Sequence, residues 1–314
     1  MIIYKNMLSF QSGKEVAIVC GGEYDEQKIY ITKEQDEPDR EIEDEDDVFE
    51  ILDEDDFKSS NYKNYSMKDK LKLANALSKY NKDINSDSDD ELFQKFDEMQ
   101  GKITNRLKKD FELSSGIIIP IPDKESERIY IAGKSGSGKS FLTAIYAREY
   151  NEMFPKRKIY IFTKHDKEKA YKNIPHIEIT CDDDMVKEEI KVTDFKKSLV
   201  IFDDCDHIQD KKISTNIRRF NNDLITTGRK YDIHTITLQH QLMDYKETRN
   251  LLNEANKVIF FNSASNYHVT RYLKVYVGLD PQQIKKITGL KSRWTMISLS
   301  IPTYVLHEHG IFLL

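Results

Sequence analysis

One short stretch constrains the fold of this chain more than any other. Residues Gly133–Ser140 read GKSGSGKS and have the pattern G-x-x-x-x-G-K-S. The stretch follows an apolar, strand-like run from Arg128 and precedes residues with a helical apolar spacing. In this setting the pattern is a phosphate loop, because its glycines let backbone N–H groups approach phosphate oxygens. The following helix points its positive end at the same anion. The stretch therefore predicts a binding site for a nucleoside triphosphate.

The loop also predicts a role for each of its side chains. The predicted nucleotide-binding residues are Gly133, Lys134, Ser135, Gly136, Ser137, Gly138, Lys139 and Ser140. We expect Lys139 to reach the β and γ phosphates of ATP, and the Ser140 hydroxyl to bind Mg²⁺. ATP and Mg²⁺ are therefore the expected cofactors. A chance glycine-rich turn is the alternative, and the flanking strand and helix disfavour it.

A second constellation lies at residues 199–204, which read LVIFDD. Four apolar residues predict a buried strand, and two acids follow at its carboxyl end, where ligands bind in open α/β sheets. We expect Asp203 to hold the hydration shell of Mg²⁺ and Asp204 to act as general base toward the attacking water. Two solvated acids at the start of a loop are the alternative interpretation.

A third candidate follows the predicted strand 233–238, where Gln239 ends an alternating apolar run. A carboxamide can both donate and accept hydrogen bonds, so it could orient water or sense the γ-phosphate. An ordinary polar residue after a strand fits the pattern equally well.

Strands alternate with helices from residue 116 onward, which predicts an α/β fold with a mostly parallel sheet. The fold class expected is a P-loop NTPase whose central sheet is flanked by helices. A C-terminal β-meander over 294–314 and a small N-terminal β/α region are expected in addition. The predicted organisation is a β-hairpin region at 1–32, an acidic linker at 33–57, a helical region at 58–115 and the ATPase core at 116–314.

The charge of the chain is uneven. Residues 36–56 hold fourteen acidic side chains against the single Arg40, within a chain whose net charge is −6. The rest of the chain is therefore net basic, which suits a nucleic-acid partner. Like-charge blocks repel themselves, so we expect a disordered linker. A mimic of the phosphate backbone is the less favoured interpretation.

Other composition signals point to an intracellular protein. The first twenty residues lack a secretory signal, and no apolar run is long enough to span a bilayer. The cysteines, Cys20, Cys181 and Cys205, are scattered and are expected to be reduced structural thiols.

Taken together, the stretches GKSGSGKS, LVIFDD and TTGRKYDIHTITLQHQ resemble the FtsK–HerA superfamily of DNA-pumping ATPases. Within it, TTGRKYDI, LLNEANKVIFFN and the tail LKSRWTMISLSIPTYVLHEHGIFLL resemble the poxvirus-type genome-packaging ATPases of nucleocytoplasmic large DNA viruses. The resemblance covers about residues 116–314. The acid pair departs from it, since many relatives have Asp-Glu where this chain has Asp203 and Asp204. The Asp204 side chain is shorter than that of Glu, so its carboxylate lies farther from the attacking water.

The resemblance implies a ring of subunits, usually hexameric, that hydrolyses ATP and moves double-stranded DNA into a capsid. It implies that Lys139 contacts the phosphates, that Ser140 binds Mg²⁺ and that Gln239 senses the γ-phosphate. Such rings place an arginine from the adjacent subunit on the phosphoryl group. Arg229 is the first choice, and Arg218 and Arg219 are the runners-up. Capsid vertex proteins are further partners, and the host cytoplasm, at the viral factory, and the virion are the implied locations.

Two other function classes remain open at this point. One is a nucleotide-dependent scaffold or switch with slow turnover, and the other, less favoured, is a small-molecule kinase. Possible DNA contacts are two basic clusters, Lys156–Lys158 with nearby lysines and Lys285–Arg293, although a solvated face is the favoured interpretation of the first. His165, His207 and His240 lack metal-ligand spacing and are interpreted as structural or loop histidines.

Overall fold

The computed structural model describes residues 6–10, 12–33, 110–164, 169–182, 190–244, 248–261 and 266–314. The predicted acidic linker, apart from Lys33, and the predicted helical region up to residue 109 lie outside the described residues. The chain divides into two compact units.

The smaller unit is built on an antiparallel strand pair. Strand β1 (Asn6–Ser9) pairs with β3 (Lys28–Lys33), so that Leu8 lies opposite Ile31, and both side chains are buried. Gly13 is required beside this pair, because its φ is +132° and a Cβ there would lie 2.4 Å from the carbonyl oxygen of Ile31. β3 thus lies at the end of the β-hairpin region predicted at 1–32.

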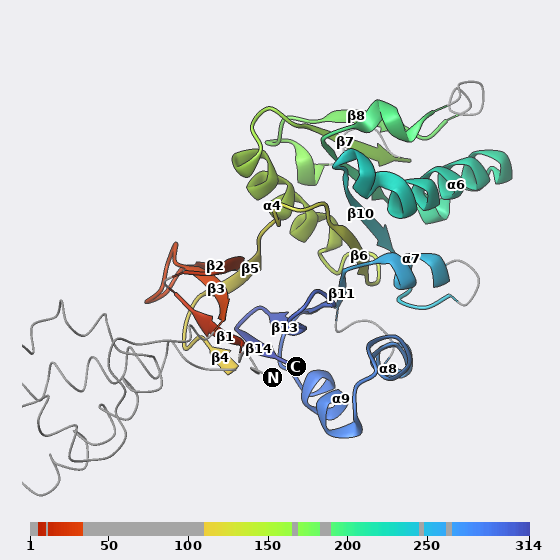
Figure 1. Ribbon diagram of the computed structural model, residues 1–314. Helices are drawn as coiled ribbons and strands as arrows, with labels where there is room; N and C mark the ends of the chain where they lie inside the picture. The colour runs from red at the N-terminus through yellow and green to blue at the C-terminus, as the bar shows by residue number, and fades with distance from the viewer. Residues whose placement is uncertain are drawn as a thin grey trace, which may run out of the picture. The chain divides into compact units, whose positions relative to one another are not determined.

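The larger unit is organised around one mixed sheet (Figure 1). Its strands are β6 (Arg128–Ala132), β7 (Lys158–Thr163), β8 (Ile177–Thr180), β9 (Ser198–Asp203), β10 (His234–Gln239), β11 (Lys257–Phe261), β12 (Trp294–Ser298), β13 (Tyr304–His307) and β14 (Gly310–Leu313). They lie in the order β14-β13-β12-β11-β6-β10-β9-β7-β8. Neighbours from β11 to β8 are parallel, and those from β11 to β14 are antiparallel. The predicted parallel sheet and C-terminal β-meander are confirmed.

Two further strands of this unit lie apart from that sheet. β2 (Lys14–Cys20) pairs antiparallel with β5 (Ile117–Pro120), and the register sets Val19 opposite Ile118. Both side chains are fully buried. β5 thus lies at the start of the predicted ATPase core.

The direction of the crossovers determines which face each helix covers. The connection from β6 to β7 contains α4 (Lys139–Met153) and runs toward β8. The connection from β9 to β10 contains α6 (Lys211–Thr227) and runs the opposite way. Right-handed crossovers in opposite directions put their helices on opposite faces of a sheet. Figure 1 accordingly shows α4 and α6 on different sides of β10.

Apolar side chains fill the space between the sheet and the helices. All six residues of β9 are buried, which requires cover on both faces. Phe202 of β9 stacks on Phe162 of β7 at 4.9 Å, and both rings pack in one cluster with Phe220 of α6. A second cluster joins β6 and β11 to α7 (Arg249–Glu254), α8 (Asn266–Tyr272) and α9 (Pro281–Thr288). None of the described helices is long and apolar enough to cross a bilayer.

A buried polar network lies at the amino ends of the parallel strands. Glu127 forms an ion pair with Lys257 and accepts a hydrogen bond from the Tyr146 hydroxyl. The Glu127 N–H donates to Nδ1 of His234 over 3.4 Å. Burial alone lowers the pKa of Lys257, but the Glu127 carboxylate more than offsets this and raises it to about 12. The ion pair connects β11 to the entry of β6.

Candidate functional site

The predicted phosphate loop joins β6 to α4, as the sequence requires. Gly138 caps α4 with φ 105°, a conformation that side chains other than glycine rarely adopt. Gly133 is required for space, since a Cβ there would lie 3.0 Å from Cβ of Phe261. The first intrahelical bond runs from Leu142 N–H to the Gly138 carbonyl. The N–H groups of residues 139–141 precede it and form the helix N-terminus next to the loop.

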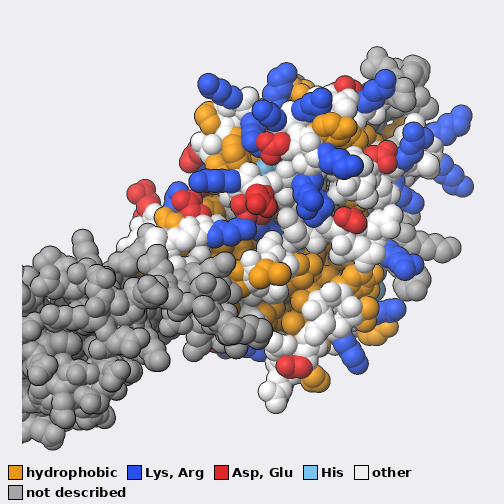
Figure 2. Space-filling model, viewed as in Figure 1, with side chains coloured by type: hydrophobic (Ala, Val, Ile, Leu, Met, Phe, Trp, Pro, Cys, Tyr) orange, Lys and Arg blue, Asp and Glu red, His pale blue; other side chains and the backbone are white. Residues whose placement is uncertain are grey.

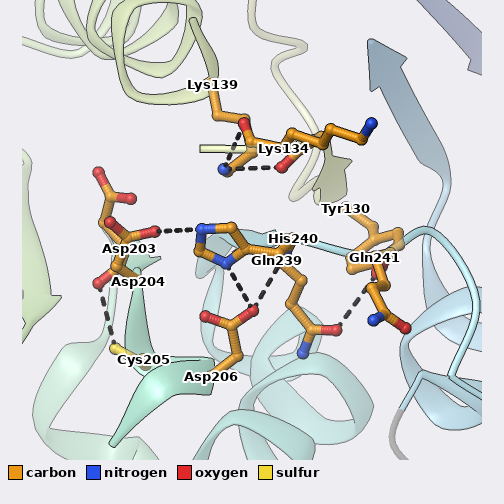
Figure 3. Close-up of polar contacts among 11 residues, drawn as sticks. Tyr130, Lys134, Lys139, Asp203, Asp204, Cys205, Asp206, Gln239, His240 and Gln241 are labelled. Atoms are coloured by element: carbon orange, nitrogen blue, oxygen red, sulfur yellow. Dashed lines mark hydrogen bonds and ion pairs between the residues drawn. The ribbon is translucent and has the colours of Figure 1, made fainter. Parts of the chain in front are cut away.

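Lys139 lies inside this loop with only 5% of its surface exposed. Its Nζ donates to the carbonyl oxygens of Gly133 at 2.9 Å and Lys134 at 3.4 Å (Figure 3). Burial lowers the pKa of Lys139, while nearby Asp204 and Asp203 act in the opposite direction. A cation held among the loop carbonyls, close to two carboxylates, is well placed for a phosphate ligand.

The two acids of the predicted pair have different surroundings. Asp203 ends β9 with 2% exposure, and its Oδ2 accepts a 2.7 Å hydrogen bond from the hydroxyl of Tyr171. Asp204 adopts left-handed backbone angles, φ 53° and ψ 26°, and its side chain is 42% exposed. Asp203 is therefore a fixed carboxylate, whereas Asp204 projects from the turn.

These surroundings fit the expected Mg²⁺ ion. The Ser140 hydroxyl and the Asp203 carboxylate are oxygen donors, which are the ligands that Mg²⁺ prefers. A carboxylate as buried as Asp203 also needs compensation for its charge, which a cation supplies.

Gln239 ends β10 at the same edge of the sheet. The hydroxyl of Tyr130 shares its single hydrogen between Oε1 of Gln239, at 3.2 Å, and the carbonyl oxygen of Gln241. Cys205, Asp206, Arg218, Asn221 and Gln239 line a hollow beside this strand end. Gln239 is thus brought to the acid pair's edge of the sheet, with its amide oxygen engaged by an aromatic hydroxyl.

His240 and Asp206 belong to the site although the sequence patterns did not single them out. His240 contacts Asp206 through its backbone N–H and its Nδ1, and contacts Asp204 through its Nε2. The ligand atoms of these three residues lie within 4.8 Å of one another. The interpretation of His240 as a structural or loop residue is thus incomplete, since its ring faces the acid pair. One sequence signal could have identified them. His240 follows Gln239 directly and Asp206 lies two residues after Asp204, so both come just after predicted site residues at the ends of neighbouring strands.

The predicted cysteine chemistry agrees with the described residues. The three cysteines are free, and Sγ of Cys205 lies 3.8 Å from Sγ of Cys181. The hydrogen bond with Cys181 and burial raise the pKa of the Cys205 thiol well above its usual range. Sγ of Cys205 also lies 3.5 Å from the carbonyl oxygen of Asp203.

Arg229 lies near the amino ends of the parallel strands, whereas the phosphate loop of its own chain lies at their carboxyl ends. It belongs to the 3₁₀ turn Gly228–Tyr231, which precedes β10, whereas Gln239 ends that strand. Five strand steps separate the two edges by roughly 17 Å. Arg229 is exposed, as are Arg218 and Arg219 on α6. Contact between Arg229 and a phosphate in this loop would therefore require a second copy of the chain.

The candidate DNA contacts are only partly available to a ligand. Figure 2 shows Lys and Arg side chains spread over the visible face around α6 and β8. Within the first basic cluster, however, Arg157 forms a 2.6 Å ion pair with Asp232 and packs over the ring of Phe154. In the second, Arg293 pairs with Glu308, while Lys285 and Lys291 are exposed. Both arginines thus have internal partners, and the exposed lysines are the freer charges.

A phosphate loop between a strand and a helix, with an acid pair and a glutamine at the ends of adjacent parallel strands, defines a P-loop NTPase fold. The chain is 36% identical over 210 residues to the uncharacterized protein V3 of Sputnik virophage. The match covers 66% of this chain and 85% of that protein, and the chain belongs to its family. No family model matches the chain.

Solved structures include weaker likenesses to this chain. One is the genome packaging NTPase B204 from Sulfolobus turreted icosahedral virus 2, at 14% identity and a TM-score of 0.43, covering 58% of this chain and 96% of that one. Another is the pCW3 conjugation coupling protein TcpA, at 15% identity and a TM-score of 0.42, covering 64% of this chain and 66% of that one.

Proposed function

We propose that the protein is an ATP-driven motor that translocates double-stranded DNA into a viral capsid. One observation carries the proposal: Lys139, the acid pair and Gln239 meet at one edge of the sheet. A phosphate loop alone serves binding, whereas carboxylates and a polar amide opposite it serve hydrolysis. The motif resemblance and the family tie to a virophage protein support the DNA and capsid part of the proposal.

Each residue of the site has a role in this proposal. Lys139 and the N-terminal N–H groups of α4 bind the phosphates. Ser140 and Asp203 hold Mg²⁺, which withdraws negative charge from the phosphates when bound. Asp204, the more exposed acid, accepts the proton of the water that attacks the γ-phosphorus. Gln239 orients that water or senses the phosphate.

The proposal includes a ring of subunits. Arg229 is exposed at the edge of the sheet that is remote from its own loop, so only a neighbouring subunit could receive it. An arginine supplied in this way stabilises the charge that develops on the transferring phosphoryl group. The exposed lysines of the second basic cluster suit contacts with the phosphate backbone of duplex DNA, which do not depend on base sequence.

The first test is ATP hydrolysis by the purified full-length chain with and without duplex DNA. We expect DNA to stimulate hydrolysis, and Lys139→Ala to reduce it by about 100-fold or more. Lys124→Ala is the matched control, since this exposed lysine precedes β6 at the opposite edge of the sheet. DNA-independent hydrolysis, or full activity in Lys139→Ala, would refute a motor. Full function of an Asp204→Asn variant would indicate a switch instead.

A second test addresses the shared site. Arg229→Ala and Lys139→Ala each inactivate the ring if Arg229 acts on a neighbour. Mixed rings recover activity, because an intact loop then meets an intact arginine. No recovery at any mixing ratio, with mixed assembly verified, would exclude Arg229 as the bridging residue.

A further inference from the structure

His240 occupies the centre of the polar cluster at the carboxyl ends of β9 and β10 (Figure 3). The two strands are parallel neighbours, and Thr237 pairs with Phe202. The residues that follow these positions therefore leave the sheet side by side. This is why His240 of one strand end comes to face Asp204 of the other.

The imidazole is held in a defined orientation by Asp206. Oδ2 of Asp206 accepts the backbone N–H of His240 at 3.0 Å and lies 3.0 Å from its Nδ1. Two contacts from one carboxylate oxygen fix both the strand end and the ring. The Asp206 and His240 side chains are only 15% and 18% exposed, so water competes weakly for these contacts.

Asp204, in contrast, is 42% exposed and stands on a left-handed turn. Among the described residues, its carboxylate has one contact of salt-bridge length, the 3.7 Å approach of His240 Nε2 to Oδ1, which is an ion pair when the imidazole is protonated. An exposed carboxylate samples several rotamers, and a general base must be held within hydrogen-bond reach of its water. The fixed ring therefore limits where this carboxylate can point.

We propose that His240, anchored by Asp206, is a positioning residue that orients Asp204 toward the water attacking the terminal phosphate of ATP. The inference rests on the proposed hydrolysis, and it adds a residue that the sequence patterns did not assign to catalysis. Because His240 follows Gln239 directly, one strand end carries both the sensor and the group that aligns the base. A shift of that strand end would move both together.

Two substitutions separate the contacts of the ring. His240→Asn places an amide near the Nδ1 position and keeps the contact with Asp206, but it is too short to reach Asp204. His240→Gln places its amide near the Nε2 position and can reach Asp204. We expect His240→Asn to lower kcat by about 10- to 100-fold with KM for ATP within about twofold, and His240→Gln to restore part of that loss. His309→Asn, at an exposed histidine on the turn between β13 and β14, is the control.

The decisive measurement is the double variant with Asp204→Asn. If His240 acts through Asp204, adding His240→Asn costs less than about twofold in kcat in that background. Equal losses in both backgrounds would show a general structural role and overturn the proposal. The proposal would also be overturned if the nucleotide-free wild type bound Mn²⁺ and His240→Asn did not, because Asp204, Asp206 and His240 would then form a metal site. Absence of hydrolysis by the wild type would overturn the proposed function and this role together, whereas full kcat in His240→Asn would overturn this role alone.

Discussion

The stability of this protein should depend on pH through His234, a residue remote from the nucleotide site. The side chain is 1% exposed, and its Nδ1 accepts the N–H of Glu127. Protonation would put a second donor against that N–H at a buried position beside Tyr150, whose ring centroid lies 5.0 Å away. Burial accordingly lowers the pKa of His234 to about 4.

The size of the effect follows from linkage. The folded-state pKa lies below the ordinary value of 6.5, so the unfolded chain takes up the proton first as the pH falls. The contribution of His234 to the free energy of unfolding is complete above about pH 6.5 and decreases toward pH 4. With these two pKa values, the loss relative to pH 7 is about 0.7 kcal/mol at pH 6 and about 2 kcal/mol at pH 5.

Urea unfolding of wild type and His234→Asn at pH 7.5, 6 and 5 measures this contribution. The substituted amide keeps an acceptor for the Glu127 N–H but does not titrate, so the variant should lack the pH-dependent loss assigned to His234. Its lower stability at every pH, caused by the smaller side chain, does not affect the comparison of slopes. Other titrating groups, such as His307, are common to both proteins and cancel. Equal pH slopes in the two proteins would refute the reasoning.

The remaining predictions concern stability and the loop. Glu127→Gln leaves the Lys257 ammonium buried without its counter-charge and should cost about 3–5 kcal/mol in urea unfolding; Glu127→Gln with Lys257→Met should recover much of it, and no recovery would count against the ion pair. Gly138→Ala forces an alanine to φ 105° and should cost about 1–3 kcal/mol while weakening ATP binding in a titration; unchanged affinity would contradict this. Asp280→Ala removes the acceptor that caps α9 through the N–H groups of Gln282 and Gln283, and should lower stability by about 1 kcal/mol, measured by thermal unfolding.

Much of the site could be predicted because its geometry follows from backbone rules. A phosphate loop requires a strand before it and a helix after it, and the carboxyl ends of parallel strands meet at one edge. Lys139, Asp203, Asp204 and Gln239 could therefore be assigned to one place from local patterns. The apolar run at 199–202 lies wholly within β9, and the strand predicted at 233–238 differs from β10 by one residue at each end.

Contacts that depend on side-chain direction could not be predicted. The turn at Asp204 is left-handed, and this conformation decides that Asp204 and Asp206 both face His240. The hydroxyl of Tyr171 reaches Asp203 from a short 3₁₀ turn with no recognisable pattern. Glu127 and Lys257 are far apart in sequence, and each alone reads as a surface charge. Such pairs become visible only when the strand order is known.

Phe261 packs against the ends of the phosphate loop but not against its tip, so the two parts differ in how freely they can move. The ring backs the loop where Gly133 and Gly138 approach it, with added Cβ atoms lying 3.0 and 3.6 Å from atoms of Phe261. At the tip, a Cβ on Gly136 would meet no atom within 4 Å. The ends of the loop therefore resist inward displacement, and compliance is confined to the tip. When a ligand enters, the loop around Gly136 can therefore move, whereas the loop ends at Gly133 and Gly138 stay in place against Phe261.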